Sequence, residues 1–111
     1  MKVFNARALA EDSDGEYVLG LRDLTTHAVY LIYGFLRPGE GGRKLHPGKG
    51  HEEILCVVQG ELIIDAHGET VSLKSGEALH LREDDEFYLK NEGEETAYYV
   101  LAGGHPPEQH P

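Results

Sequence analysis

The strongest constraint on this chain is a series of short runs of Val, Ile, Leu, Tyr and Phe, separated by turns that contain glycine. The runs recur about every ten residues, a spacing typical of β-sandwiches and β-barrels. No stretch has the length and the 3.6-residue periodicity that would predict a helix. We therefore expect an antiparallel all-β domain with strands over residues 17–22, 27–36, 51–59, 61–66, 69–74, 77–82, 86–91 and 96–102.

The turns between these runs support the antiparallel arrangement. Ala66-His67-Gly68 predicts a tight hairpin, and Asn91-Glu92-Gly93 offers residues that tolerate positive φ. Residues 37–42 are a loop by composition, and the Gly- and Pro-rich tail 103–111 is not expected to continue a strand. A chain of 111 residues suits one domain. Residues 1–111 are thus predicted to form a single barrel domain, with its core at about 17–102.

Composition excludes several classes of partner. The formal net charge is −10, from 20 acidic against 10 basic residues, and no basic cluster exceeds Arg43-Lys44. Nucleic acid and anionic membrane are therefore not expected partners. No apolar run approaches the roughly 18 residues of a spanning helix, and the N-terminal segment turns acidic before a signal-peptide core. A cytoplasmic protein is expected, and the single cysteine, Cys56, suits a reducing compartment.

The candidate site lies at the start of the strand 51–59. Side chains alternate between the two faces of a strand, so His51, Glu53, Leu55 and Val57 share one face. An inward imidazole and carboxylate on so apolar a strand are costly unless they are hydrogen-bonded, metal-bound or wetted by a cavity. His46, in the preceding loop, can reach the same place. Two imidazoles and one carboxylate with open positions suit a divalent transition metal such as Fe, Mn, Ni or Zn.

A metal-free pocket is the alternative interpretation of the same residues. Glu53 would then accept a hydrogen bond from His51 or a backbone amide, and the ligand would be held by Tyr, His and Glu side chains alone. His80, in the middle of the strand 77–82, is a reserve metal ligand, although a lone strand histidine is more often structural. Both interpretations place the site at Glu53, and neither assigns a catalytic residue.

The spacing around Glu53 resembles the first motif of the cupin family. That motif is a glycine, five residues, His-x-His, three or four residues, a glutamate, six residues and a glycine. Glu53 to Gly60 reproduces the Glu-to-Gly half, and Pro38-Gly39 resembles the Pro-Gly that leads into the motif. Counting back from Glu53 puts His46 on the first family histidine and Gly48 on the second.

Other frames of the His-x-His half remain open. Counting forward from Gly39 puts Leu45 at the place of the first histidine. An insertion within residues 47–50 would instead make His46 the second histidine, with Lys44 at the first place and His51 outside the motif. The alignment of the His-x-His half therefore decides which histidines of this chain correspond to the metal-binding histidines of the family.

The second cupin motif survives in its spacing and not in its residues. The stretch Gly76 to Asn91 keeps the overall length, but Arg82 and Asp84 stand where the family has proline and glycine. Phe87 stands where the family has its remaining metal-binding histidine. We expect Phe87 and Leu55 to line the pocket, with core packing as the more ordinary role of Phe87.

The resemblance, which covers residues 30–102, implies a jelly-roll barrel that binds a small molecule. It also implies a homodimer, since small barrels of this family commonly pair through their strands. With a metal on His46, His51 and Glu53, it suggests oxygenase- or isomerase-type chemistry on an oxygen-rich small acid or phenol. The alternatives are a non-catalytic, metal-free binding or sensor module and a purely structural subunit without a cavity.

Overall fold

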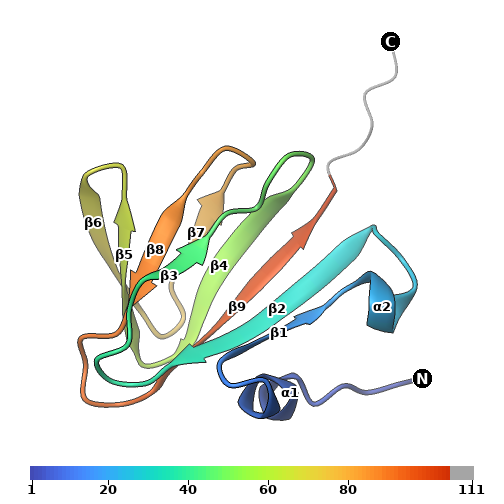
Figure 1. The fold of residues 1–111 in the computed structure, drawn as a ribbon, viewed down its shortest axis with the longest axis horizontal. Helices are drawn as coiled ribbons and strands as arrows, with labels where there is room; N and C mark the ends of the chain where they lie inside the picture. The colour runs from blue at the N-terminus through green and yellow to red at the C-terminus, as the bar shows by residue number, and fades with distance from the viewer. Residues whose placement is uncertain (106–111) are drawn as a thin grey trace.

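The computed structural model describes residues 1–105, in which two antiparallel sheets face each other (Figure 1). The larger sheet has the order β1-β2-β9-β4-β7 and the smaller has the order β3-β8-β5-β6. The strands of the larger sheet are β1 (Glu16–Leu19), β2 (Val29–Leu36), β4 (Glu52–Gln59), β7 (Ala78–Leu81) and β9 (Ala97–Gly104). Those of the smaller sheet are β3 (Arg43–Leu45), β5 (Glu61–Ala66), β6 (Glu69–Lys74) and β8 (Phe87–Lys90).

The eight strands expected from the sequence are all present, with ends shifted by a few residues, so the all-β prediction is confirmed. The hairpin at residues 66–68 joins β5 to β6, and the loop at 37–42 has no regular structure. Local alternation is clearest on β4, which buries one face and exposes the other.

Three elements were not expected from the sequence. Helix α1 (Ala6–Asp12) begins where the Asn5 side chain accepts a hydrogen bond from the Ala8 amide at 3.0 Å. Helix α2 (Leu21–Leu24) is a single turn that replaces the end of the strand expected over 17–22. Each helix, like the three-residue β3, is too short to show a period in the sequence, and α1 buries only one residue, Ala10.

Strand β9 is longer than expected. It continues through Gly103 and Gly104, which pair with Tyr30 and Val29 of β2 on one side and with Glu53 and Glu52 of β4 on the other. The prediction that the tail begins at residue 103 is therefore wrong by two residues. In the middle of a sheet, both neighbours supply hydrogen-bond partners, which outweighs the low strand propensity of glycine.

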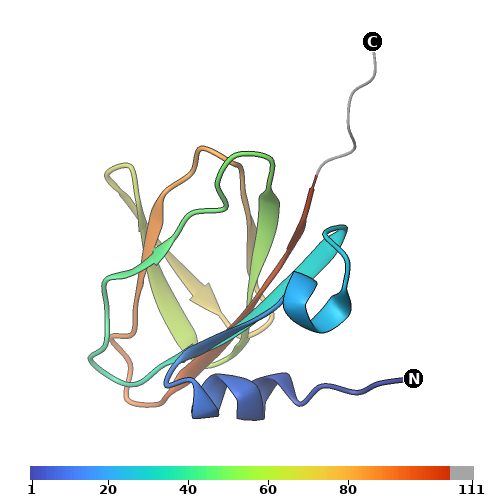
Figure 2. The same cartoon turned by 45° about the vertical axis from the view of Figure 1, so that its right-hand side comes forward.

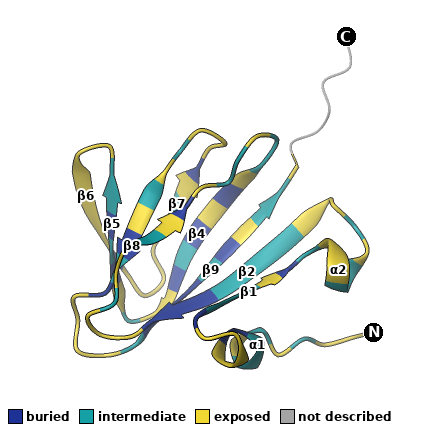
Figure 3. Cartoon of the chain, in the orientation of Figure 1, coloured by how far each residue is buried: buried dark blue, intermediate teal, exposed yellow. Residues whose placement is uncertain are grey.

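The core lies between the two sheets. On β4, Leu55 and Val57 are fully buried, whereas Ile54 and Val58 on the outer face are 53% and 42% exposed. This alternation is visible along β4 in Figure 3. The buried side chains that fill the interior are Leu36, Leu45, Leu55, Val57, Leu62, Ile64, Leu73, Leu81, Leu89, Ala97, Tyr99 and Leu101.

A smaller cluster covers part of the outer face of the larger sheet. Ala10 of α1 packs against Phe35 and Tyr98, and the Arg7 side chain lies over the Tyr98 ring, 4.0 Å from its centroid. Helix α1 lies at the opposite end of the larger sheet from the C-terminal end of β9 (Figure 2). We call these two ends the α1 end and the pocket end.

Candidate functional site

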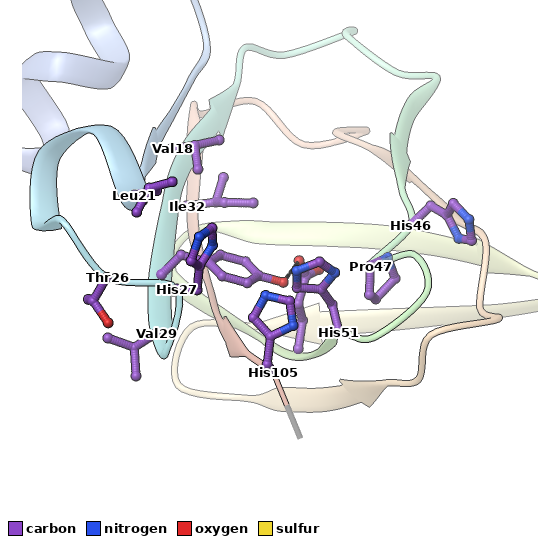
Figure 4. A pocket seen from close by; sticks show the side chains of 13 residues that line it. Val18, Leu21, Thr26, His27, Val29, Ile32, His46, Pro47, His51 and His105 are labelled. Carbon is purple, nitrogen blue, oxygen red and sulfur yellow. Dashed lines mark hydrogen bonds between the residues drawn. The ribbon is translucent and has the colours of Figure 1, made fainter. Parts of the chain in front are cut away.

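A cavity of about 380 Å³ opens at the pocket end (Figure 4). Its walls combine apolar side chains from β1, α2 and β2 with histidines from three separate segments. The lining residues are Val18, Gly20, Leu21, Thr26, His27, Val29, Tyr30, Ile32, His46, Pro47, His51, Glu53 and His105. A cavity of this size, largely apolar with a few convergent polar groups, is characteristic of small-molecule sites.

Glu53 is the buried polar residue of this cavity. Its side chain is inward on β4, as strand alternation predicted, and the residue is only 6% exposed. The Tyr30 hydroxyl donates a hydrogen bond to Glu53 Oε2 at 2.6 Å. Burial, reinforced by this hydrogen bond and by the adjacent carboxylate charge, raises the pKa of Tyr30 above its ordinary value. Tyr30 therefore remains a hydrogen-bond donor at neutral pH.

Gly103 makes the contact between Tyr30 and Glu53 possible. Tyr30 on β2 and Glu53 on β4 are both paired with Gly103 on the intervening strand β9. The tyrosine side chain must cross β9 to reach the carboxylate, and a Cβ at position 103 would lie 2.5 Å from Tyr30 Cζ. Only a glycine leaves room for the ring.

Three histidines gather beside this pair. The ring centroids of His51 and His105 are 4.2 Å apart, those of His27 and His105 are 5.9 Å apart, and His51 lies edge-on to Tyr30 at 5.7 Å. Their proximity is visible in Figure 4. The sequence analysis placed His105 in the tail that begins at residue 103. The extension of β9 instead places it at the cavity, while His110 lies outside the described residues.

His46 lines the cavity from the loop between β3 and β4 but is set apart from the other histidines (Figure 4). Its Nδ1 lies 2.7 Å from the backbone carbonyl oxygen of Asp85. Within residues 1–105, no group of three His, Cys, Asp or Glu side chains is close enough together to hold a metal. In this arrangement His46, His51 and Glu53 do not fit a transition metal, and we assign no metal-dependent step to the site.

The remaining sequence candidates lie away from the cavity. His80, the reserve ligand, is on the outer face of β7, where its Nε2 is 2.7 Å from Glu52 Oε1. Leu55 is fully buried and Phe87 packs against the same core, so neither lines the cavity as expected. Phe87 has the core-packing role that the sequence also suggested.

The charge of the cavity is unbalanced. None of its lining residues is a lysine or an arginine, and Glu53 is its only acidic residue. Across residues 1–105, Tyr30 is the only hydrogen-bond donor to the Glu53 carboxylate, and no ion pair involves it. The second carboxylate oxygen, Oε1, has no donor. Because no buried side-chain oxygen or nitrogen in residues 1–105 lacks a partner, Oε1 is not buried and is open to the cavity.

Sequence reasoning expected tyrosine side chains at the pocket without assigning Tyr30, and it missed His27 and the role of Gly103. Strand alternation alone puts Tyr30 and Ile32 on one face of β2, which was the available signal. The missing information was the strand order β2-β9-β4, which brings residues 23 positions apart into hydrogen-bond contact.

Comparison with known proteins defines the family. A cupin domain model matches residues 34–103, and the chain therefore belongs to the cupin family. The confirmed fold is the cupin-type antiparallel barrel. No curated protein matches the chain.

Solved structures share this fold at low identity. A cupin protein from Bacteroides fragilis has a TM-score of 0.74 at 19% identity, covering 100% of this chain and 86% of its own. The cupin domain of an XRE family transcriptional regulator from Enterobacter cloacae has a TM-score of 0.69 at 20% identity, covering 84% and 99%. A predicted oxalate decarboxylase from Thermotoga maritima has a TM-score of 0.68 at 17% identity, covering 82% and 81%.

Within the described part of the chain, neither α1 nor α2 is long and apolar enough to cross a bilayer.

Proposed function

We propose that this chain is a small-molecule-binding cupin whose ligand occupies the cavity at the pocket end. The observation that supports this function is Glu53, a buried carboxylate with one donor and one oxygen open to a cavity of about 380 Å³. Burying such a group without a full set of partners costs stability, so its retention points to use by a ligand. The cavity also argues against a purely structural subunit.

A fragment screen by two-dimensional amide NMR tests this function. We expect some fragments to shift the amide signals of Val18, Tyr30, His51 and Glu53 while leaving those of the hairpin between β5 and β6 unchanged. The hairpin lies on the other sheet and serves as an internal control. A diverse library that produces no shifts at the cavity would contradict the proposed function.

Metal-dependent oxygenase or isomerase activity is the second candidate, with Fe, Mn, Ni or Zn on His46, His51 and Glu53. It is favoured by one observation, namely that all three residues line the same cavity. A metal would require His46 to leave the Asp85 carbonyl oxygen. The fold does not choose between candidates, because its structural neighbours include a predicted decarboxylase and a regulator domain.

Metal content of untagged protein distinguishes the two candidates. Stoichiometric metal that disappears in His51→Ala and Glu53→Ala, and persists in His80→Ala, would establish the metal-dependent function. His80 is a matched control because it lies on the outer face of the same sheet. Protein that takes up no metal yet binds fragments would support the metal-free binding or sensor function.

We also propose a homodimer, with the uncovered outer face of the larger sheet as its interface. Val29, Ile54 and Val58 are 58%, 53% and 42% exposed on this face, and clustered exposed apolar side chains mark association surfaces. Light scattering after size exclusion should give the mass of two chains for the wild type and of one chain for Ile54→Lys. A monomeric wild type at high concentration would contradict this proposal.

A further inference from the structure

The cavity contains a carboxylate that no lysine or arginine matches. Glu53 has one carboxylate oxygen open to the cavity, and no lysine or arginine lines the walls. The rings of His27 and His51 make no hydrogen bond within residues 1–105. Each neutral imidazole offers one donor N–H and one acceptor nitrogen, whereas the carboxylate of Glu53 only accepts. A ligand that hydrogen-bonds to the open oxygen of Glu53 must therefore bring a donor.

The other walls determine the rest of the ligand. Val18 and Leu21 are each 50% exposed although they line the cavity, so an apolar ligand would cover them. The tyrosine and histidine rings add flat surfaces next to Glu53. A small apolar or aromatic body would bury these surfaces, and the polar end of the ligand would lie at Glu53.

We propose that the ligand of this cavity is a small organic amine, bound in its ammonium form with an apolar or aromatic body. This inference rests on the proposed small-molecule function and specifies its ligand class. The ammonium donates one hydrogen bond to the open oxygen of Glu53 and has two further donors for the imidazole nitrogens. The charge of the bound amine balances that of Glu53, and no lysine or arginine of the cavity does so.

The charge of the whole chain acts in the same direction. A net charge of −10 attracts cations and repels anions before either reaches the cavity. Within the cavity, the low local polarity strengthens the attraction between an ammonium and the Glu53 carboxylate relative to water. An organic acid of the same size would place a second negative charge next to the first.

Three probes that share one body test the inference. Phenethylamine, 2-phenylethanol and phenylacetate are cationic, neutral and anionic at neutral pH, and their binding is followed by amide NMR titration. We expect phenethylamine to bind most tightly and phenylacetate to bind least. Glu53→Gln should weaken phenethylamine binding roughly 10- to 100-fold, the range of a hydrogen bond to a charged group, while affecting 2-phenylethanol little.

Glu52→Gln is the matched control. It makes the same change of charge one residue away, on the outer face beside His80, and should leave phenethylamine binding essentially unchanged. Thermal unfolding of both variants shows whether they remain folded. Equal weakening by the two variants would mean that only the overall charge matters, which overturns the inference.

The remaining outcomes separate this inference from the proposed function. If phenylacetate or 2-phenylethanol binds the cavity as tightly as phenethylamine, the amine inference fails and the small-molecule function stands. The same holds if phenethylamine does not bind while other fragments shift the cavity signals. If neither the three probes nor any fragment shifts those signals, both proposals fail.

Discussion

The inner face of the larger sheet carries the same arrangement of side chains at its two ends. At each end a tyrosine crosses a glycine on the neighbouring strand to reach a glutamate on the strand beyond. The α1-end row is Tyr99, Gly34 and Glu16, on β9, β2 and β1, and the pocket-end row is Tyr30, Gly103 and Glu53, on β2, β9 and β4.

The two rows differ in what surrounds the tyrosine. Tyr99 is fully buried, and its hydroxyl donates to Glu16 and accepts from Arg43 Nη1 at 3.2 Å. Arg43 Nη1 also lies 3.1 Å from the Gly15 carbonyl oxygen and 2.7 Å from that of Phe35. The α1-end row is thus a charge-balanced network that ties β1, β2, β3 and β9 together.

The pocket-end row has no counterpart of Arg43. Glu53 has Tyr30 as its single donor within the described residues, and an open cavity takes the place of the guanidinium. At the α1 end, where Arg43 contacts the tyrosine, the tyrosine–glutamate pair is therefore structural. At the pocket end, where no arginine or lysine contacts it, the pair is open to a ligand. In the inferred complex, the ligand's ammonium takes the part that Arg43 takes at the α1 end.

Among the variants that test the difference between the two rows, Arg43→Met gives the largest expected loss of stability. The substitution keeps the aliphatic stem but removes the guanidinium donor to Tyr99 and to the carbonyl oxygens of Gly15 and Phe35, of which the Gly15 oxygen keeps the Phe35 amide as a donor. We expect a loss of about 3 kcal/mol in the free energy of unfolding, measured by urea denaturation. A loss below about 1 kcal/mol would show that the guanidinium is not what makes this row structural.

Gly34→Ala and Gly103→Ala compare the two rows at the same position. A Cβ at residue 34 would collide with the buried Tyr99 ring, which has no space to move. At residue 103 it would meet the Tyr30 ring, which can move into the cavity, and the backbone carbonyl oxygen of Glu52 at 2.9 Å, which requires a small shift of β4. We expect Gly34→Ala to lower the free energy of unfolding by about 2.5 kcal/mol and Gly103→Ala by about 1.5 kcal/mol. Equal losses in urea denaturation would contradict the distinction between a packed and an open row.

Tyr99→Phe removes one hydroxyl and changes the response to alkaline pH. Burial, followed by the charge of Glu16 and its hydrogen bond, raises the pKa of Tyr99. The unfolded chain releases this proton near pH 10 while the folded chain keeps it, so stability is complete below that pH. It then falls by about 1.4 kcal/mol per pH unit above it. Tyr99→Phe should lose about 1 kcal/mol at neutral pH and show a shallower alkaline decline in chemical denaturation; an unchanged slope would contradict this assignment.

The sequence predicted the strands because they are runs of β-branched, aromatic and other apolar residues between glycine-containing turns, and β4 also shows a period of two residues in its burial. Elements with too few residues to show a period, such as β3 and α1, were missed. Gly103 and Gly104 were assigned to the tail because glycine composition indicates a loop, and only the pairing with β2 and β4 makes them a strand. Local patterns carry no information about neighbours across a sheet.

The residues of the candidate site also fall into those that the sequence predicted and those that it did not. The inward position of Glu53 was predictable from alternation along β4, and His51 lines the cavity as the same pattern suggested. Tyr30 and His105 were not predictable, because their contribution depends on strand order and on where β9 ends. The family motif indicated the place of the site through the spacing from Glu53 to Gly60, but it did not indicate the partner of Glu53.

Glu53→Gln gives the smallest expected effect on stability and separates the two rows most directly. Glutamine can still accept the Tyr30 hydrogen bond, and it removes a buried charge that no lysine or arginine of the cavity balances. We expect the free energy of unfolding to stay the same or rise by about 0.5 kcal/mol, because groups kept for binding are often not optimal for stability. The exposed control Glu52→Gln should change it by less than about 0.5 kcal/mol. If Glu53→Gln instead loses more than about 1 kcal/mol in urea denaturation, Glu53 is structural like Glu16, and the contrast between the rows disappears.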